Sequence, residues 1–464
     1  MKFLFAVLFT LIAGLSYAGR GAFLIIDNSS NHLIKVTSVN YGCLKNITDA
    51  AITLLPVSAS NLYIEQDCLF VPGFGELELF NVDNNQAIAT IQYSVRVSNT
   101  EAKVKEQTNP DFSVRALSVN TLQRFQDQDV IMVRITPNGK ESAVYTDWMW
   151  QMHQKLSNKT LAQLVIPGTH DSLTEDLSST ICNSDPDANQ WASFGDVGKG
   201  YAQAQYLTLQ EQLERGLRYF DIRLCYQNDN SYPSHSLLSN KTFAVYLEQL
   251  ADFLKYNSHE IVVLDFQLYG YNSTTLAGLL AELKQRFEGK FISYVKFKPT
   301  STLAQIWDEA SHSEATPNLI VILPEVKTIL TNSTVVVDKE SPQAELELTQ
   351  LLQDPEYAFV WPRNTLRSPW YNTMDLDQLL EENTGALYYK DSNNLFVHQL
   401  VQTPDGDFIL KHLSYSLRSV AYRSLSAIYA WQWASLGSNK LNIVIRDWSN
   451  GFDGAIFAMH ANQL

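Results

Sequence analysis

The sequence has few cysteines and no CxxC or HExxH pattern, so the common signatures of a metal site are missing. It also lacks low-complexity and proline- or glycine-rich tracts, and its 45% hydrophobic and 18% charged residues are typical of a globular protein. Basic residues are in deficit, and a formal net charge of -15 disfavours nucleic acid as a partner. We therefore expect a globular protein that has no cofactor, no metal ion and no nucleic-acid partner.

The first residues have the pattern of a secretory signal. Lys2 precedes an apolar run over residues 3–15, and the small-residue site Ser16, Tyr17, Ala18 follows it. An uncleaved anchor is the alternative, but the run is shorter than the roughly 20 apolar residues that span a bilayer, and no later run is long enough. We predict a signal peptide over residues 1–18, cleavage after Ala18, and a location outside the cell or in the cell envelope or periplasm.

The four cysteines fit an oxidising compartment. Cys43 and Cys68 lie in the N-terminal part of the chain, and Cys182 and Cys225 lie in the C-terminal part. We predict one disulfide within each part. Free buried thiols are the alternative, because spacing alone does not fix connectivity.

The chain is long enough for two hydrophobic cores at 464 residues. Residues 19–145 contain short β-branched and aromatic runs between turn-forming residues, at positions 22–26, 33–37, 76–80, 87–97 and 130–135. This pattern of short runs and turns predicts an all-β, antiparallel sandwich. Its role is either structural or that of a binding or positioning module.

From residue 146 to 464 apolar strands alternate with helical stretches. Strands are predicted near Phe220 and at residues 260–266, 318–323, 357–361, 386–389 and 441–445, and helices at 208–215, 242–255 and 276–287. The alternation predicts an α/β fold, a TIM-type (β/α)8 barrel that is distorted or regular. A doubly wound open sheet is the alternative, but the glycine-rich phosphate turn that normally follows its first strand is missing.

Several polar segments occur at the ends of predicted strands in a fixed order. They are Ile166–Ser172, Ala202–Gln205 with Leu207 and Leu209, Gln212–Leu213, Gly216–Arg223, His235, and Val444–Asp447. Over most of residues 155–464 this order resembles phosphatidylinositol-specific phospholipase C of the bacterial, X-domain-only type. Pro362, Pro369–Trp370 and Asn372–Thr373 are also similar to eukaryotic X-domain-containing relatives. Residues 19–142 lie outside the resemblance.

The resemblance implies a set of catalytic roles. His170 is the base that deprotonates the inositol 2-hydroxyl, Asp447 orients it, and His235 on a polar loop protonates the leaving glycerol oxygen. Elementary chemistry supports this set, because phosphodiester cleavage without a metal needs a base, an acid and positive charge on the phosphoryl oxygens. Carboxyl ends of parallel strands meet at one edge, so these groups are expected to converge.

Arg223 is expected to clamp the phosphate through its planar fork. Residues i and i+2 share a strand face, so Asp221 points inward with Arg223, and Asp171 and Asp221 orient Arg223 and His235. Each role has a structural alternative, since a histidine after a strand is often only hydrogen-bonded and Asp171 could cap a turn. Calcium-dependent relatives have acidic ligands where this chain has Arg223, so we predict no calcium requirement.

Three further residues are predicted to contact substrate. Gln267 stands where the bacterial enzymes that the chain resembles have a lysine, near the end of the strand over residues 260–267. Trp361 and Arg363 lie at the end of another predicted strand and are expected to contact the headgroup, with packing and a surface charge as the alternatives.

The sequence thus predicts a secreted phosphoric diester hydrolase, a phospholipase C. Its substrate is phosphatidylinositol or a glycosylphosphatidylinositol anchor, and its products are diacylglycerol and a cyclic inositol phosphate. We expect a monomer that contacts the membrane surface peripherally. The alternatives are a metal-dependent glycerophosphodiester phosphodiesterase, which has a Glu-x-Asp pair on its second strand, and a catalytically silent lipid- or glycan-binding surface protein.

Overall fold

The computed structural model describes residues 21–47, 51–68, 71–96, 100–120, 129–188, 195–310, 316–331 and 342–463. The chain divides into two compact units: unit 1 is Met1–Gly139 with Lys411–Ser414, and unit 2 is Lys140–Leu410 with Tyr415–Leu464. The predicted signal peptide lies outside the described residues. Within those residues, no helix is both long enough and apolar enough to cross a membrane.

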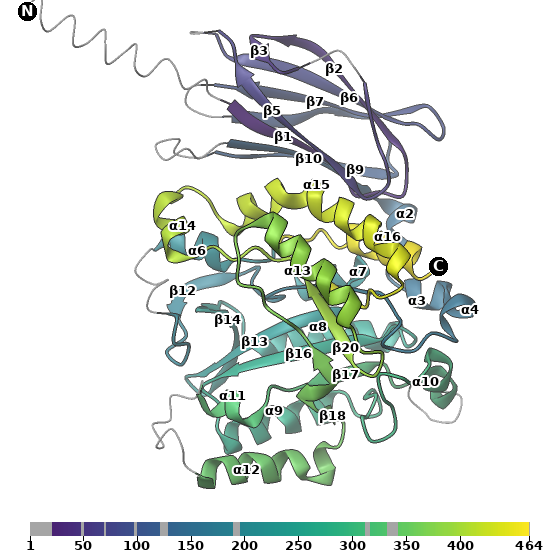
Figure 1. The fold of residues 1–464 in the computed structure, drawn as a ribbon, viewed down its shortest axis with the longest axis vertical. Helices are drawn as coiled ribbons and strands as arrows, with labels where there is room; N and C mark the ends of the chain where they lie inside the picture. Colours follow the sequence, from purple (N-terminus) through teal and green to yellow (C-terminus); the bar gives the residue numbers. More distant parts are fainter. Residues whose placement is uncertain are drawn as a thin grey trace, which may run out of the picture. The chain divides into compact units, whose positions relative to one another are not determined.

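Unit 1 contains two five-stranded sheets (Figure 1). The first has the order β3-β5-β1-β10-β9, with bounds Leu44–Lys45, Ser58–Gln66, Gly21–Asn28, Asp129–Pro137 and Phe112–Val119. The second has the order β4-β2-β6-β7-β8, with bounds Ile52–Leu54, Ile34–Gly42, Gly73–Asn81, Gln86–Val95 and Thr100–Gln107. The strand pair β1 and β10 is parallel, so the all-antiparallel expectation is wrong for that pair.

Apolar side chains from both sheets of unit 1 form one buried cluster. Leu24 on β1 and Ile131 on β10 belong to it, together with Leu79 on β6 and Ile91 on β7. The predicted disulfide Cys43–Cys68 is present in this unit. The alternation of buried and exposed residues along β6 follows directly from the two-residue period of a strand with one apolar face.

Unit 2 is built around eight parallel strands in the order β19-β20-β21-β11-β13-β16-β17-β18. Their bounds are Leu366–Arg367, Leu395–Gln399, Ile443–Arg446, Ile166–Thr169, Tyr219–Gln227, Val262–Tyr269, Leu319–Ile322 and Val360–Trp361. The sheet is curled but not a complete ring, because β18 and β19 do not pair within the described residues. Each has only two residues, and Pro362, which has no N–H donor, and a 3-10 turn over Arg363–Thr365 separate them.

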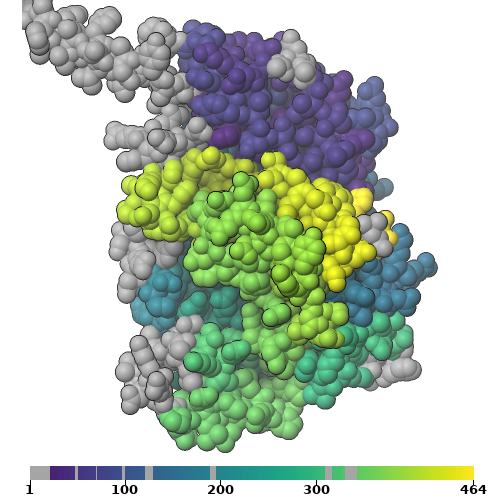
Figure 2. All heavy atoms as spheres, in the orientation of Figure 1, coloured from purple at the N-terminus to yellow at the C-terminus, as the bar shows by residue number. Residues whose placement is uncertain are grey.

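Helices precede, separate and follow the strands of the sheet along the chain. They are α2 (Gly139–Ala143), α3 (Trp148–Gln151), α4 (His153–Leu156), α6 (Asp196–Ala202), α7 (Leu209–Glu214), α8 (Phe243–Tyr256), α9 (Ser273–Arg286), α10 (Leu303–Ala310), α11 (Val326–Thr331), α12 (Pro342–Gln353), α13 (Leu376–Tyr389), α14 (Gly406–Lys411), α15 (Leu417–Ser435) and α16 (Phe452–Ala461). Figure 1 shows α9 near β16 and β17, with α12 on the far side of α9 from these strands. In Figure 2, α13 (green) and α15 (yellow) form a continuous surface, where Trp431 Nε1 donates to Thr384 Oγ1 at 2.8 Å.

Successive side chains of β13 point alternately into the hydrophobic core and to the opposite face of the sheet. Phe220, Ile222 and Leu224 belong to a buried cluster with leucines of α8 and α9. The intervening Asp221 and Arg223 therefore point to the inside of the curled sheet, as predicted. The second predicted disulfide, Cys182–Cys225, joins β13 to the segment after β12 (Leu177–Ile181).

One predicted strand is wrong. Residues 386–389 are the last turn of α13, which begins after Asp375, whose side chain accepts a hydrogen bond from the backbone N–H of Gln378. A four-residue apolar run does not distinguish a strand from the buried side of a helix, and the capping signal decides in favour of the helix. The strand in this region is β20, further along the chain.

Candidate active site

His170 and Asp447 follow neighbouring strands. The last pair in the ladder of β11 with β21 is Thr169 with Arg446, and His170 and Asp447 are the next residues. Gly168 permits β11 to lie close to β13, because a Cβ at this position would be 2.6 Å from the carbonyl oxygen of Tyr219. The two strands therefore deliver an imidazole and a carboxylate to the same edge of the sheet.

A hairpin brings His235 back to the Arg223 strand. β13 continues to Gln227, turns at Asn228 and Asp229, which have φ values of 52° and 58°, and returns as β14 (Asn230–His235). Two residues with positive φ favour the type I′ turn of a two-residue hairpin. Arg223 thus lies within a strand rather than at its end, and the polar loop predicted for His235 is wrong. The Asn-Asp pair was the overlooked signal.

His170 is held on both sides of its ring. Nδ1 lies 2.8 Å from Asp447 Oδ1, and Nε2 lies 2.8 Å from Arg223 Nη2. A guanidinium donates only, so Nε2 accepts from Arg223 and the ring proton is on Nδ1, where it is donated to Asp447. In this arrangement the nitrogen predicted to act as the base has its lone pair engaged by the predicted phosphate clamp.

Electrostatics favours a proton on His170. Burial lowers the pKa of the imidazole, but the charges of Asp171 and Asp447 and the hydrogen bond to Asp447 outweigh it and raise the pKa to about 9, with Arg223 opposing them. A proton on Nε2 would put two donors 2.8 Å apart, so the contact geometry decides for the neutral ring while Arg223 stays in place. Movement of Arg223 toward a bound anion would release the lone pair.

Asp171 connects the cationic groups. One oxygen forms an ion pair with Arg223 Nε, and the other lies 3.2 Å from His235 Nδ1 and 3.4 Å from His170 Nε2. The side chain is buried, and although burial raises its pKa, Arg223, His170 and His235 outweigh this and lower the pKa of Asp171. The two imidazole rings are 6.4 Å apart between centroids. Both histidines therefore belong to one site, with Arg223 bound to the carboxylate between them.

The backbone is unusual directly beside all three predicted acid–base groups. Asp171 after His170, Ser236 after His235 and Trp448 after Asp447 have φ values of 43°, 57° and 50°. A residue with a Cβ in this left-handed region costs roughly 1 kcal/mol or more, and such strain concentrates at functional sites. The backbone conformation at these three positions is therefore costly in stability, and it sets the direction of the preceding side chains.

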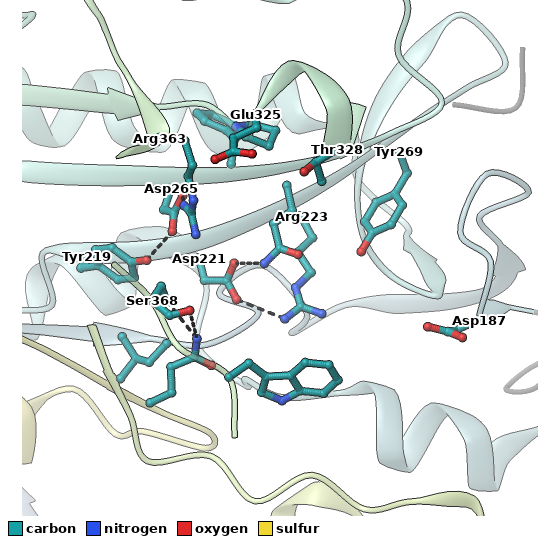
Figure 3. Close-up of a pocket in the computed structure, with 16 residues that line it drawn as sticks. Asp187, Tyr219, Asp221, Arg223, Asp265, Tyr269, Glu325, Thr328, Arg363 and Ser368 are labelled. Atoms are coloured by element: carbon teal, nitrogen blue, oxygen red, sulfur yellow. Dashed lines mark hydrogen bonds and ion pairs between the residues drawn. The ribbon is translucent and has the colours of Figure 1, made fainter. Parts of the chain in front are cut away.

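A cavity of about 410 Å³ opens beside Arg223 (Figure 3). Its lining residues are Asp187, Tyr219, Asp221, Arg223, Asp265, Phe266, Gln267, Tyr269, Pro324, Glu325, Thr328, Arg363, Ser368, Trp370, Gln399 and Ile445. Asp221 connects two predicted residues, because Gln267 Nε2 donates to Oδ1 at 3.0 Å and Arg223 Nη2 lies 3.4 Å from Oδ2. The predicted clamp thus faces a space large enough for a small polar headgroup.

Arg363 lines the cavity and Trp361 does not. Arg363 Nη1 is paired with Asp265, which also accepts from the Tyr219 hydroxyl at 2.6 Å. Burial raises the pKa of Asp265, although Arg363 and Tyr219 oppose this effect. The Trp361 indole is fully buried and donates to the carbonyl oxygen of Ile292 at 2.5 Å. The expected headgroup contact is wrong for Trp361, because the indole packs into the core.

Comparison with known proteins was made against family models, curated proteins and solved structures. No family model matches the chain. PI-PLC X domain-containing protein 3 of Danio rerio is 27% identical over 325 residues, which cover 67% of this chain and 90% of that protein. The Homo sapiens protein of the same name is 26% identical, with 67% and 91% covered. The chain is thus similar to PI-PLC X domain-containing proteins over about two thirds of its length.

This confirms the resemblance predicted from the sequence. PI-PLC X domain-containing protein 2 of Mus musculus is 25% identical over 348 residues, which cover 71% of this chain and 92% of that protein. Among solved structures, phosphatidylinositol-specific phospholipase C from Listeria monocytogenes covers 68% of this chain and 98% of its own, at 18% identity and a TM-score of 0.47.

Among the described residues, one group of side chains could hold a metal ion. Atoms of His170, Asp171 and Asp221 lie within 4.8 Å of one another. Arg223 already approaches all three residues: Nε pairs with Asp171, and Nη2 with Asp221 and His170. The guanidinium occupies the space and neutralises the carboxylates that would attract a cation, so the residues present do not fit a metal.

Sequence reasoning missed several cavity residues. Asp265 and Tyr269 stand two residues before and after Gln267 on β16 and share its inward face. The same two-residue period that located Asp221 beside Arg223 could have found both. Tyr219, two residues before Asp221, follows the same rule.

Proposed function

We propose that this protein is a phosphodiesterase of the phospholipase C type. It cleaves the bond between phosphate and glycerol in phosphatidylinositol, or in the same group of a glycosylphosphatidylinositol anchor, to diacylglycerol and a cyclic inositol phosphate. The observation that carries the proposal is Asp171, buried between two imidazoles and a guanidinium beside a cavity of about 410 Å³. The relationship to the PI-PLC X domain-containing proteins supports the same class of reaction.

Binding of the phosphate begins the reaction. An anion in the cavity draws the Arg223 guanidinium away from His170 Nε2, which lies only 2.8 Å from it in the present arrangement. Nε2 then takes the proton of the inositol 2-hydroxyl, while Asp447 at 2.8 Å from Nδ1 stabilises the resulting imidazolium. The pKa near 9 that the carboxylates give His170 favours this charged form.

The 2-oxygen attacks phosphorus as the bond to glycerol breaks. Protonated His235 donates its proton to the departing glycerol oxygen and becomes neutral. Its Nδ1 lies 2.7 Å from the carbonyl oxygen of Ala202, which accepts the proton at that nitrogen, and 3.2 Å from the Asp171 carboxylate, so Nε2 carries the proton that is donated. Arg223 offsets the negative charge that develops on the phosphoryl oxygens. Every proton and electron pair is accounted for without a metal ion.

The cavity wall suits the polyol. Asp265, Arg363 and Gln267 present acceptors and donors at fixed positions, because each is already hydrogen-bonded to a neighbour. Trp370 lines the cavity and is 59% exposed, which is suitable for contact with the lipid interface. We further propose that residues 1–18 direct secretion and that unit 1 is a β-sandwich accessory domain, while unit 2 is a TIM-type barrel opened at one seam.

Turnover of phosphatidylinositol vesicles in excess EDTA tests this function. We expect cyclic inositol phosphate as the first product by 31P NMR, with an unchanged rate in EDTA. His170→Ala and His235→Ala should each abolish turnover, whereas His153→Ala, which removes a histidine stacked on Trp150, should not. Loss of activity in EDTA would favour a metal-dependent glycerophosphodiester phosphodiesterase. Absence of turnover throughout would favour a silent binding protein.

A further inference from the structure

The segment Ala202–Gln205, which begins at the last residue of α6, contacts each predicted acid–base group or its neighbour in the chain. The carbonyl oxygen of Ala202 lies 2.7 Å from His235 Nδ1. The next two carbonyl oxygens accept from Trp448, which follows Asp447: Gln203 from its indole at 2.9 Å and Ala204 from its backbone N–H at 2.7 Å. Four consecutive residues thus connect strands that are far apart in the sequence.

Gln205 completes this arrangement with its side chain. Its Nε2 donates to the carbonyl oxygens of His170 and Arg446, at 2.9 Å each, and the residue is 1% exposed. These are the carbonyls of the base itself and of the residue before Asp447. The ladder between β11 and β21 ends at Thr169 and Arg446, and the next contact, from His170 N to Arg446 O, is 3.4 Å long. The Gln205 amide therefore joins β11 to β21 at the point where the hydrogen bond between their backbones becomes long.

The position of Gln205 is itself fixed. Thr174 Oγ1 accepts from the backbone N–H of both Ala204 and Gln205 at 3.0 Å, and donates to the carbonyl oxygen of Asp171 at 2.8 Å. In contrast, Gln205 Oε1 is buried and has no hydrogen-bond partner in the described part of the chain. An unsatisfied buried oxygen costs about 1–3 kcal/mol, so the side chain is not optimised for stability alone.

The hydrogen bonds of the Gln205 side-chain amide hold the backbone beside two strained residues. Asp171 and Trp448 have φ values of 43° and 50°. Asp171 follows His170, whose carbonyl oxygen accepts a hydrogen bond from Gln205. Trp448 follows Asp447, which is the residue after the second acceptor, Arg446. Strained residues persist only where the surroundings over-determine them. Without the two hydrogen bonds, relaxation of either residue would rotate His170 or Asp447 away from their 2.8 Å contact.

We propose that Gln205 is a positioning residue for the reaction, and that it sets the alignment of His170 with Asp447 by clamping the two backbone carbonyls at the end of the β11–β21 ladder. It touches neither the cavity nor any predicted reacting atom. Its kinetic consequences rest on the proposed function, but its effect on the His170 ring does not.

Gln205→Met is the main test, because methionine fills similar space and cannot donate. On phosphatidylinositol vesicles we expect kcat to fall roughly 10- to 100-fold with KM changed by less than about twofold, the scale seen when a residue that orients a catalytic group is removed. The matched control is Gln432→Met, a buried glutamine of α15 whose Oε1 also has no partner among the described residues. It should match the loss of thermal stability and leave kcat unchanged.

Gln205→Glu provides a conservative rescue. A protonated carboxyl can donate one of the two hydrogen bonds, whereas a carboxylate can donate none. The ratio of the kcat of Gln205→Glu to that of the unaltered protein should rise as the pH falls, and the same ratio for Gln205→Met should stay flat. A ratio that stays flat for both would contradict the hydrogen-bond explanation. Because glutamate is nearly isosteric, this variant also serves if the methionine variant does not fold.

A readout without turnover separates this proposal from the previous one. In protein labelled with 15N-histidine, the His170 Nδ1–H signal and its titration should shift in Gln205→Met, while Gln432→Met leaves both unchanged. An unchanged His170 signal, or unchanged kcat in a folded Gln205→Met protein, would overturn the positioning role. If the unaltered protein does not turn over phosphatidylinositol, the proposed function fails, but the ring signal still decides the role of Gln205.

Discussion

Two buried histidines on the same curled sheet have opposite electrostatic environments. His398 on β20 is fully buried, and burial together with the charge of Lys390 lowers its pKa to about 3. His170, after β11, is 7% exposed, yet Asp171 and Asp447 reverse the effect of burial and raise its pKa to about 9. Burial alone makes an imidazole neutral and inert, and paired carboxylates are what make it available for proton transfer.

The same contrast applies to the cations. Lys390, near the start of β20, donates to the carbonyl oxygen of Ala162 at 2.6 Å, and burial with the nearby Lys440 lowers its pKa to about 8. Arg223 is approached by Asp171 and Asp221, which overcome burial and raise its pKa further. Lys390 thus satisfies a backbone oxygen, whereas Arg223 is paired with carboxylates and lines the cavity.

Asp447→Asn should have the largest effect, since it makes His170 resemble His398. Loss of the carboxylate removes one of the charges that raise the pKa of His170 and disfavours the Nδ1–H tautomer. We expect kcat to fall about 10⁴-fold, as for triads that lose their carboxylate. NMR titration of the His170 ring should show a lower pKa. An unaltered titration would mean that Asp447 does not control the ring.

Arg223→Lys should have the next largest effect. Lysine keeps the charge but cannot contact Asp171, Asp221 and His170 at once, as the guanidinium does. We expect a loss of about 10²- to 10³-fold in kcat, comparable with removal of one group that stabilises transition-state charge. Steady-state kinetics on phosphatidylinositol measures it. Rates close to those of the unaltered protein would remove Arg223 from the clamp role.

His398→Phe tests the inert histidine through stability. The folded-state pKa is about 3 and the unfolded value about 6.5, so His398 leaves stability intact above pH 6.5 and destabilises the protein as the pH falls toward 3. Each pH unit in this window costs up to about 1.4 kcal/mol. Between pH 6.5 and 4.5 the free energy of unfolding, measured in urea, should therefore fall by up to about 2.7 kcal/mol less in the variant than in the unaltered protein. Parallel pH profiles would show that His398 is not the titrating group.

Lys390→Met should have the smallest effect. Lys390 contributes to the low pKa of His398, so its removal should raise that pKa, although burial, the larger cause, remains. Destabilisation of the protein by acid should then occur over a narrower pH range, because the pKa values of His398 in the folded and unfolded states move closer together. NMR titration of His398 measures the shift, and a fall in its pKa would contradict the assigned charge effect.

Much of the site could be predicted from short-range rules. Strand ends located His170 and Asp447, and the two-residue period placed Asp221 beside Arg223 on the inner face. These predictions succeeded because they depend on the pleat and on parallel strand direction. The roles assigned to the residues, the signal peptide and the function of unit 1 stay predictions.

Other features depended on long-range packing. Trp361 is the last residue of β18, close to the edge that bears the site residues, but its indole donates to the carbonyl oxygen of Ile292 in the core. No local pattern reports which partner a side chain meets.

The sequence by itself determined which chemical groups stand at the ends of the strands, because side-chain direction in a strand is set by position alone. Only the tertiary structure decided that Asp171 lies between Arg223 and both histidines, and that Gln205 clamps the carbonyls of two strands. The contact between Gln205 and Arg446 joins residues 241 positions apart, and strands that are distant in the sequence become neighbours only in the folded sheet.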